Sequence, residues 1–114
     1  MRLTYNKKDG NKVSVKIREV DVGKPATIGR GTEAVIRVED EKCSRVHASI
    51  MYWDGMFILR DMKSFNGTYL NGERIEVTRL KAGDVIKIGD TEIKTMDDNV
   101  SKKDTVLTSP PEEA

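Results

Sequence analysis

The sequence predicts a single all-β domain, built as a sandwich or a barrel of short strands. The main observation is a period of two: Val13, Val15 and Ile17 alternate with polar residues, which predicts a half-buried strand. A second observation is a pair of turn signals, Asp54-Gly55 and Asn71-Gly72, each lying between two strand-like runs. No stretch has the spacing of an amphipathic helix. Many short strands separated by turns are typical of sandwiches and barrels.

Further strand-like runs follow one another along the chain, with turn residues between them. They cover residues 26–28, 34–38, 47–53, 56–61, 68–70, 84–88 and 91–96. Asp54-Gly55 joins two of these runs in a predicted hairpin, and Asn71-Gly72 joins one of them to residues 73–75 in a second hairpin. Gly83-Asp84 and Gly89-Asp90 mark the turns of the last part.

The length and composition indicate a small folded protein. A chain of 114 residues suits one compact domain with a single core. No apolar run approaches the ~20 residues that cross a bilayer, and the N-terminus lacks the apolar segment of a signal peptide. We therefore expect a cytoplasmic protein that does not bind membranes. The single cysteine, Cys43, fits a reducing compartment, and the compact form without insertions favours a bacterial source.

The formal charge is distributed unevenly along the chain. Residues 97–114 hold five acidic and two basic residues, a charge of −3, which leaves +4 for residues 1–96 because the whole chain carries +1. The last stretch also lacks aromatic residues and ends in Ser-Pro-Pro-Glu-Glu-Ala. We therefore expect a folded domain over 1–96 and a flexible acidic tail or linker over 97–114. A charge of +4 is too weak for a dedicated nucleic-acid binder but suits a ligand with local negative charge.

Four short stretches have residue types that are poor choices for building strands. They are Gly29-Arg30, Ser44-Arg45-Val46-His47, Asn66-Gly67-Thr68 and Asn71-Gly72. Each lies at a strand edge or in a connection, where binding residues usually occur. Two arginines and a serine in loops can bind phosphate, because a guanidinium holds two oxygens at once and a hydroxyl completes the shell.

The order and spacing of these four stretches resemble the signature of the forkhead-associated (FHA) domain family, over roughly residues 13–95. The resemblance implies an antiparallel β-sandwich of about eleven strands that presents loops at one end to phosphothreonine peptides. It also implies a recognition module that is not an enzyme, uses no cofactor or metal, and works with Ser/Thr protein kinases.

The resemblance assigns the phosphopeptide contacts to two loops. Arg30 reaches the phosphate from the loop after its strand, Ser44 donates its hydroxyl to a phosphate oxygen, and Arg45 lies beside them. Apart from the resemblance, the position of Lys42 just before the Cys43-Ser44 loop makes it a candidate to add charge near the phosphate or to select a residue downstream of it.

In the second loop, Asn66 binds the peptide main chain. Phe65 stands where many relatives carry a small polar residue, so that this peptide contact is lost or becomes apolar. The residues expected to support the site are Gly29, His47, Gly67, Thr68, Asn71 and Gly72. Among them, His47 is expected to hydrogen bond to both loops, and Asn71 to tie the loop beneath Asn66.

Three other functions are weighed against this one. A hydrolase using Ser44 and His47 lacks a third group to orient the base. An oligonucleotide-binding barrel would need aromatic side chains interleaved along one face, and only six aromatic residues are present. A phosphate-independent FHA-like scaffold or dimerisation domain would commonly lack Arg30 and Ser44, which this chain retains.

The tail carries candidate phosphoacceptors, Thr105 and Thr108, and Ser109 precedes a proline. Its charge is opposite to that of residues 1–96. We therefore consider that a kinase modifies one threonine and the domain then binds its own tail, in cis or between two copies. An ordinary linker to a further effector domain is the alternative.

Overall fold

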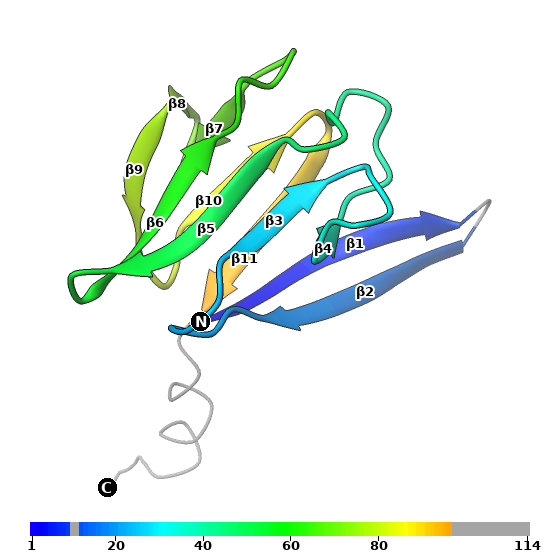
Figure 1. Cartoon of the computed structure of the whole chain (residues 1–114). Coiled ribbons are helices and arrows are strands. Elements are labelled where there is room, and N and C mark those ends of the chain that lie inside the picture. The colour runs from blue at the N-terminus through cyan, green and yellow to red at the C-terminus, as the bar shows by residue number, and fades with distance from the viewer. Residues whose placement is uncertain (10–11, 97–114) are drawn as a thin grey trace, which may run out of the picture.

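The computed structural model describes residues 1–9 and 12–96; for residues 7–9 and 12 it describes the backbone only. It contains eleven strands and, over these residues, no helix. The strands form two sheets that lie face to face (Figure 1). The prediction of an all-β sandwich is confirmed, and the alternative of a barrel is wrong. The expected tail, 97–114, lies outside the described residues.

The first sheet has six strands in the order β2-β1-β11-β10-β7-β8. Its strands are β1 (Arg2–Asp9), β2 (Lys12–Glu19), β7 (Thr68–Leu70), β8 (Glu73–Ile75), β10 (Val85–Ile88) and β11 (Thr91–Met96). Every pair of neighbouring strands in this sheet is antiparallel. Because β2 and β8 have a neighbour on one side only, they are the edges of this sheet.

The second sheet has five strands in the order β4-β3-β5-β6-β9. Its strands are β3 (Ala26–Gly29), β4 (Ile36–Arg37), β5 (Ala48–Trp53), β6 (Met56–Asp61) and β9 (Val77–Leu80). The short β4 runs parallel to β3, whereas the other pairs are antiparallel.

Apolar side chains from the inner faces of both sheets form one buried core. Its buried members are Leu3, Tyr5, Val20, Ala26, Ile28, Ile36, Val38, Cys43, Ala48, Ile50, Leu59, Leu80, Ile86, Ile88 and Ile93. Burial of this area supplies most of the driving force for folding. Residues 1–9 and 12–96 contain no helix that could cross a membrane.

Both predicted two-residue hairpins are present. Asp54 and Gly55 have φ angles of 52° and 81°, and Asn71 and Gly72 have 51° and 90°. Two successive positive φ angles define the turn type whose twist matches that of antiparallel strands, and Asn, Asp and Gly tolerate them best. The turns therefore fix the β5–β6 and β7–β8 registers locally.

The prediction for β2 is wrong in one respect: its apolar face points to solvent. Val13, Val15 and Ile17 are 60%, 65% and 55% exposed. The register with β1 explains this arrangement, because Lys16 lies opposite the buried Tyr5 and Val15 lies opposite Asn6. The polar side chains therefore share the face of the core, while the hairpin extends past the neighbouring sheet (Figure 1).

Two strands were not anticipated from the sequence, β1 and β9. In β1, only Leu3 and Tyr5 are apolar and buried, so the apolar alternation covers too few positions to stand out. β9 is four residues long, and three of them are at least partly exposed. Pairing with neighbouring strands stabilises both: β1 pairs with β2 and β11, and β9 pairs with the longer β6.

Candidate functional site

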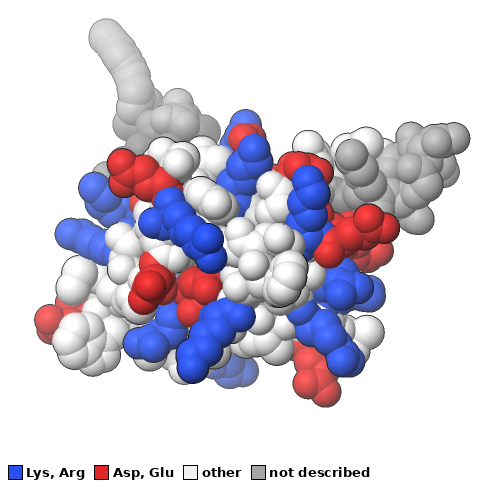
Figure 2. Space-filling view, turned by 90° about the horizontal axis from the view of Figure 1, so that it is seen from above, with Lys and Arg blue, Asp and Glu red and all other residues white. Residues whose placement is uncertain are grey.

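The connections that carry the predicted site residues gather at one end of the sandwich. This end holds the β3–β4, β4–β5 and β6–β7 connections and the β10–β11 turn, at the top of Figure 1. Seen from that end, Lys and Arg side chains stand around a central area of uncharged side chains, with Asp and Glu between some of them (Figure 2).

Backbone hydrogen bonds join the first two connections side by side. The N–H of Arg30 donates to the Ser44 carbonyl at 2.9 Å, and the N–H of Gly31 donates to the Arg45 carbonyl at 3.1 Å. Gly29 permits this approach: a Cβ atom there would lie 2.0 Å from the Arg45 carbonyl oxygen. Only glycine fits at this position, so the Gly29-Arg30 pair in the sequence reflects close packing of two loop backbones.

The Arg30 side chain is held against the same loop. Its Nε donates to the Cys43 carbonyl at 3.0 Å, while the residue as a whole is exposed. Its two terminal nitrogens donate to no residue within 1–9 and 12–96. The guanidinium therefore has a fixed position and two nitrogens that can donate to a ligand.

Ser44 lies beside Arg30 and has an unused donor. Its Oγ accepts a hydrogen bond from the N–H of Phe65 at 3.1 Å. A hydroxyl both accepts and donates, and over the described residues its proton has no acceptor. Ser44 thus links the β4–β5 and β6–β7 connections and still has one hydrogen to offer.

His47 holds these two connections together from below. It is fully buried; its Nδ1 accepts from the Ser44 N–H at 2.9 Å, and its Nε2 lies 2.8 Å from the Gly67 carbonyl. A backbone N–H can only donate, so Nδ1 is the acceptor and Nε2 carries the proton. Neither nitrogen remains to take a proton from Ser44 Oγ, and the hydrolase alternative has no base.

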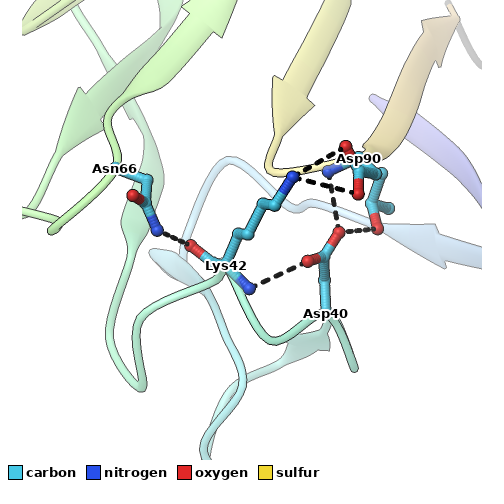
Figure 3. Close-up of polar contacts among 5 residues, drawn as sticks. Asp40, Lys42, Asn66 and Asp90 are labelled. Atoms are coloured by element: carbon cyan, nitrogen blue, oxygen red, sulfur yellow. Dashed lines mark hydrogen bonds and ion pairs between the residues drawn. The ribbon is translucent and has the colours of Figure 1, made fainter.

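Asn66 and Lys42 meet at the edge of the same end (Figure 3). Asn66 Nδ2 donates to the Lys42 carbonyl at 2.8 Å. The Lys42 ammonium points away from Asn66 toward Asp90, with Nζ–O distances of 3.3 and 3.4 Å. Both side chains are well exposed, at 59% and 75%, so this ion pair is weak and the ammonium can exchange partners.

Asp40 fixes the β4–β5 connection to the β10–β11 turn. Its carboxylate accepts from the Lys42 N–H at 2.9 Å, the Asp90 N–H at 2.8 Å and the Thr91 hydroxyl at 2.9 Å. Burial alone would raise the pKa of Asp40, but these hydrogen bonds and the nearby Lys42 charge lower it below its ordinary value. The sequence analysis did not identify this residue, because two of its partners, Asp90 and Thr91, are 50 and 51 positions away in the chain.

A second carboxylate shapes the β6–β7 connection. Asp61 accepts from the hydroxyls of Ser64 and Thr68 at 2.5 and 2.6 Å and from the Ser64 N–H at 3.1 Å. Ser64 Oγ in turn accepts from the Gly67 N–H at 3.0 Å. Burial alone would raise the pKa of Asp61, but the hydrogen bonds from Ser64 and Thr68 lower it. Asp61 and Ser64 were not anticipated, although Thr68 was.

The remaining predicted residues lie as follows. Phe65 is 91% exposed at the tip of this connection. Arg45 is also exposed, and no partner of its guanidinium is recorded among the described residues. Asn71 does not contact the Asn66 connection: it hydrogen bonds to Asp84 and Val85 at the other end of β7, at 2.9–3.0 Å. Gly72 has open space around it, in keeping with a turn residue.

Arg74, on β8, is an additional basic residue that the sequence analysis missed. Its guanidinium covers Gly67, where an added Cβ would lie 2.7 Å from Arg74 Nε. Gly67 also has a φ of 92°, so both the backbone conformation and the space require glycine. Arg74 therefore extends the basic rim beside Asn66.

The fold and the site together define a β-sandwich binding module whose loops offer hydrogen-bond donors and positive charge at one end. A family model described as the FHA domain matches residues 26–89. The chain belongs to the FHA domain family, whose members are protein-interaction modules.

Similar proteins support the same assignment. The chain is 37% identical over 92 residues to the FHA domain-containing protein FhaA of Mycobacterium tuberculosis, and this match covers 80% of this chain and 16% of FhaA. It resembles the crystal structure of the FhaA FHA domain in complex with the intracellular domain of Rv3910, with a TM-score of 0.67, 32% identity, and 81% and 97% of the two chains covered. A further FHA structure, from an analysis of phosphothreonine-dependent FHA domain interactions, matches with a TM-score of 0.64, 32% identity, and 84% and 96% covered.

Proposed function

We propose that this FHA domain docks onto a phosphothreonine in a partner protein, with Arg30, Ser44 and Arg45 binding the phosphate. One observation carries the proposal: a backbone hydrogen bond holds Arg30 beside Ser44, and each side chain keeps a free donor. These donors, the Arg30 terminal nitrogens and the Ser44 hydroxyl, have no acceptor among the described residues. A phosphate presents three acceptor oxygens and about −1.5 to −2 charges, which matches this set of donors.

The neighbouring residues extend the site along the peptide. Asn66 uses its Nδ2 for the Lys42 carbonyl, which leaves its Oδ1 to accept from a peptide N–H. Lys42 can exchange Asp90 for an acidic group downstream of the phosphothreonine, since its present ion pair is exposed. Phe65 offers an apolar ring to the peptide in place of a hydrogen bond.

Residues that do not touch the ligand keep the site in shape. Gly29 allows the two loops to approach, and His47 ties Ser44 to Gly67. Thr68, through Asp61, orders the connection that carries Asn66. Preorganised loops bind with a smaller loss of conformational entropy, so these supports contribute to affinity indirectly.

The wider role is recognition of a partner that a Ser/Thr protein kinase has marked, in the cytoplasm and without turnover of a substrate. The relatives support this role, because one FHA domain was solved with a partner domain and another in a study of phosphothreonine-dependent interactions. The chain spans 16% of the length of FhaA, and we infer that a domain over 1–96 acts with a further effector domain through the linker 97–114.

A second proposal is that the domain binds a phosphorylated threonine of its own tail. Thr105 and Thr108 lie outside the described residues, in a segment whose charge of −3 is opposite to that of residues 1–96. After phosphorylation, either threonine becomes a ligand for the Arg30–Ser44 site in cis or in a second copy. Kinase treatment should then weaken binding of an external phosphopeptide to the wild type but not to a Thr105→Ala/Thr108→Ala double variant. Equal affinity in all samples would exclude tail binding.

One alternative is kept because of Phe65. A ring that is 91% exposed could pack against a partner without any phosphate, as in a scaffold or dimerisation domain. In that case the affinity for a partner would be the same with and without phosphorylation.

A peptide titration decides between the two functions. Fluorescent peptides with the same sequence would carry threonine, phosphothreonine or phosphoserine, and Arg30→Ala would be compared with Arg79→Ala on the distant β9. We expect binding to phosphothreonine only, weakened at least ~10-fold in Arg30→Ala and unchanged in Arg79→Ala, since a charge-assisted bond contributes ~1.5–3 kcal/mol. Equal binding of all three peptides would favour the phosphate-independent scaffold.

A further inference from the structure

The edge strand β2 presents two features that the fold does not use. Every second residue of an edge strand directs its N–H and C=O away from the sheet, and β2 has β1 on one side only. On its outer face, Val13, Val15 and Ile17 are each more than half exposed. β2 therefore offers backbone groups and an apolar stripe to an added strand.

The charges of β2 discourage pairing with a second copy. Lys16 and Arg18 lie on the opposite face from the valines, level with Tyr5 and Leu3 in the register with β1. An antiparallel pair of two β2 strands centred on Ile17 would place Lys16 opposite Arg18 on both sides of the axis. Like charges directly opposite each other destabilise a strand pair, so this edge favours a strand with an acidic residue opposite Arg18.

The segment 97–114, which contains Asp104, begins close to the edge. Met96, the last residue of β11, lies opposite Arg2 in β1, and Arg2 lies opposite Glu19 at the end of β2. Two strand spacings of ~4.8 Å separate β11 from β2, about 10 Å in all. The six residues 97–102 can span up to ~20 Å at ~3.3 Å each. The segment that follows can therefore reach β2 at its Glu19 end.

We propose that residues 103–109 add to the edge of β2 as an antiparallel strand, with Leu107 opposite Val15. In this register, Thr105 lies opposite Ile17, and Leu107 covers the apolar stripe. Asp104 comes opposite Arg18, and Lys103 comes opposite Glu19, whose carboxylate also accepts from Arg2 Nε at 2.9 Å. These two pairs have opposite charges, while Lys16 faces the uncharged Val106. Pro110 follows directly, where a strand would have to end because proline lacks an N–H.

Hydrogen exchange on the full chain, followed by NMR, tests strand addition. Leu107→Pro removes an N–H from the middle of the added strand, and Val100→Pro, in the crossing segment, is the matched control. We expect the β2 amides that point away from β1, and the amides of residues 103–109, to exchange at least tenfold faster in Leu107→Pro than in wild type and Val100→Pro. Unprotected amides over residues 103–109 in the wild type would overturn the proposal.

A charge swap tests the register. Arg18→Asp and Asp104→Arg should each remove the protection, and the double variant should restore it, because the pair then has reversed signs. Protection unaffected by either single variant would overturn this register. Protection that rises with protein concentration, together with a dimer in sedimentation, would assign the edge to a second copy and contradict the proposal. These measurements need no phosphopeptide, so they are independent of the proposed function.

Discussion

The imidazole Nδ1 of His47 accepts a hydrogen bond from the backbone N–H of Ser44 at 2.9 Å, below the loop that carries the Ser44 hydroxyl. The same ring reaches Gly67 in the neighbouring connection through Nε2. A single buried side chain therefore sets the separation between the loop that holds Ser44 and the one that holds Asn66. The proposed binding site depends on this internal support as much as on its exposed donors.

Replacing His47 by alanine should reduce both stability and binding. The change leaves the Ser44 N–H and the Gly67 carbonyl without their partner, and each unsatisfied buried group costs about 1–3 kcal/mol. We expect the free energy of unfolding to fall by ~2–5 kcal/mol in urea titrations, with weaker phosphopeptide binding below the transition. A His47→Ala variant with wild-type stability would contradict the supporting role.

Gly29→Ala should disturb the site through the backbone. The new Cβ would lie 2.0 Å from the Arg45 carbonyl oxygen, so the two loops must separate. Overpacking of this kind costs ~1–3 kcal/mol, and we expect a lower midpoint in thermal unfolding together with weaker binding. Gly23→Ala is the control, since nothing lies within 4 Å of a Cβ at that position. Equal effects of the two changes would argue against the close approach.

Ser44→Ala should affect binding far more than folding. The variant loses the proton that we assign to the phosphate, which is worth ~1.5–3 kcal/mol or roughly a 10- to 100-fold loss of affinity. Stability should change by no more than ~1 kcal/mol, because only the Phe65 N–H loses an acceptor. Ser49→Ala on β5 is the control, and isothermal titration with a phosphothreonine peptide is the measurement. Unchanged affinity in Ser44→Ala would remove this residue from the site.

Arg74→Gln should weaken binding modestly and make it less sensitive to salt. Arg74 lies over Gly67 at the rim of the site, and exposed charges contribute up to ~1 kcal/mol, or about 2- to 5-fold in affinity. Arg79→Gln, on the outer face of β9, carries the same change of charge away from the site. The two variants should differ at low salt and converge at high salt; identical salt profiles would exclude Arg74 from the rim.

Asp61 should stabilise the domain except in acid. The hydrogen bonds from Ser64 and Thr68 hold the pKa of Asp61 below its ordinary value of 3.8 in the folded state, so the unfolded state binds a proton first as the pH falls. The stabilisation is present above pH 3.8 and is lost as the pH falls through the lower folded-state pKa. We expect the difference in unfolding free energy between wild type and Asp61→Asn to shrink over that range. For Glu73→Gln, an exposed control, no such trend is expected.

The sequence by itself determined the all-β class, both hairpins and the loops that carry the site. Asp54-Gly55 and Asn71-Gly72 encode their turns in local φ angles, which need no distant partner. The ordered motifs around Arg30, Ser44 and Asn66 likewise indicated which connections would meet at one end. The turns depend on the conformation of a few neighbouring residues, which is visible in a short stretch of sequence. The site loops were indicated by the resemblance of their ordered motifs to the FHA family.

Only the tertiary structure decided which way β2 faces and which distant groups complete the site. Alternation showed that Val15 and Lys16 lie on opposite faces, but the register with β1 selected the solvent face for Val15. The contacts of Asp40 with Asp90 and of Arg74 with Gly67 arise from the arrangement of strands in the sheets. Pairing between strands depends on packing over the whole sandwich, and a shift of one residue reverses every side chain. Local sequence therefore defines the strands, while their mutual packing defines the surface they present.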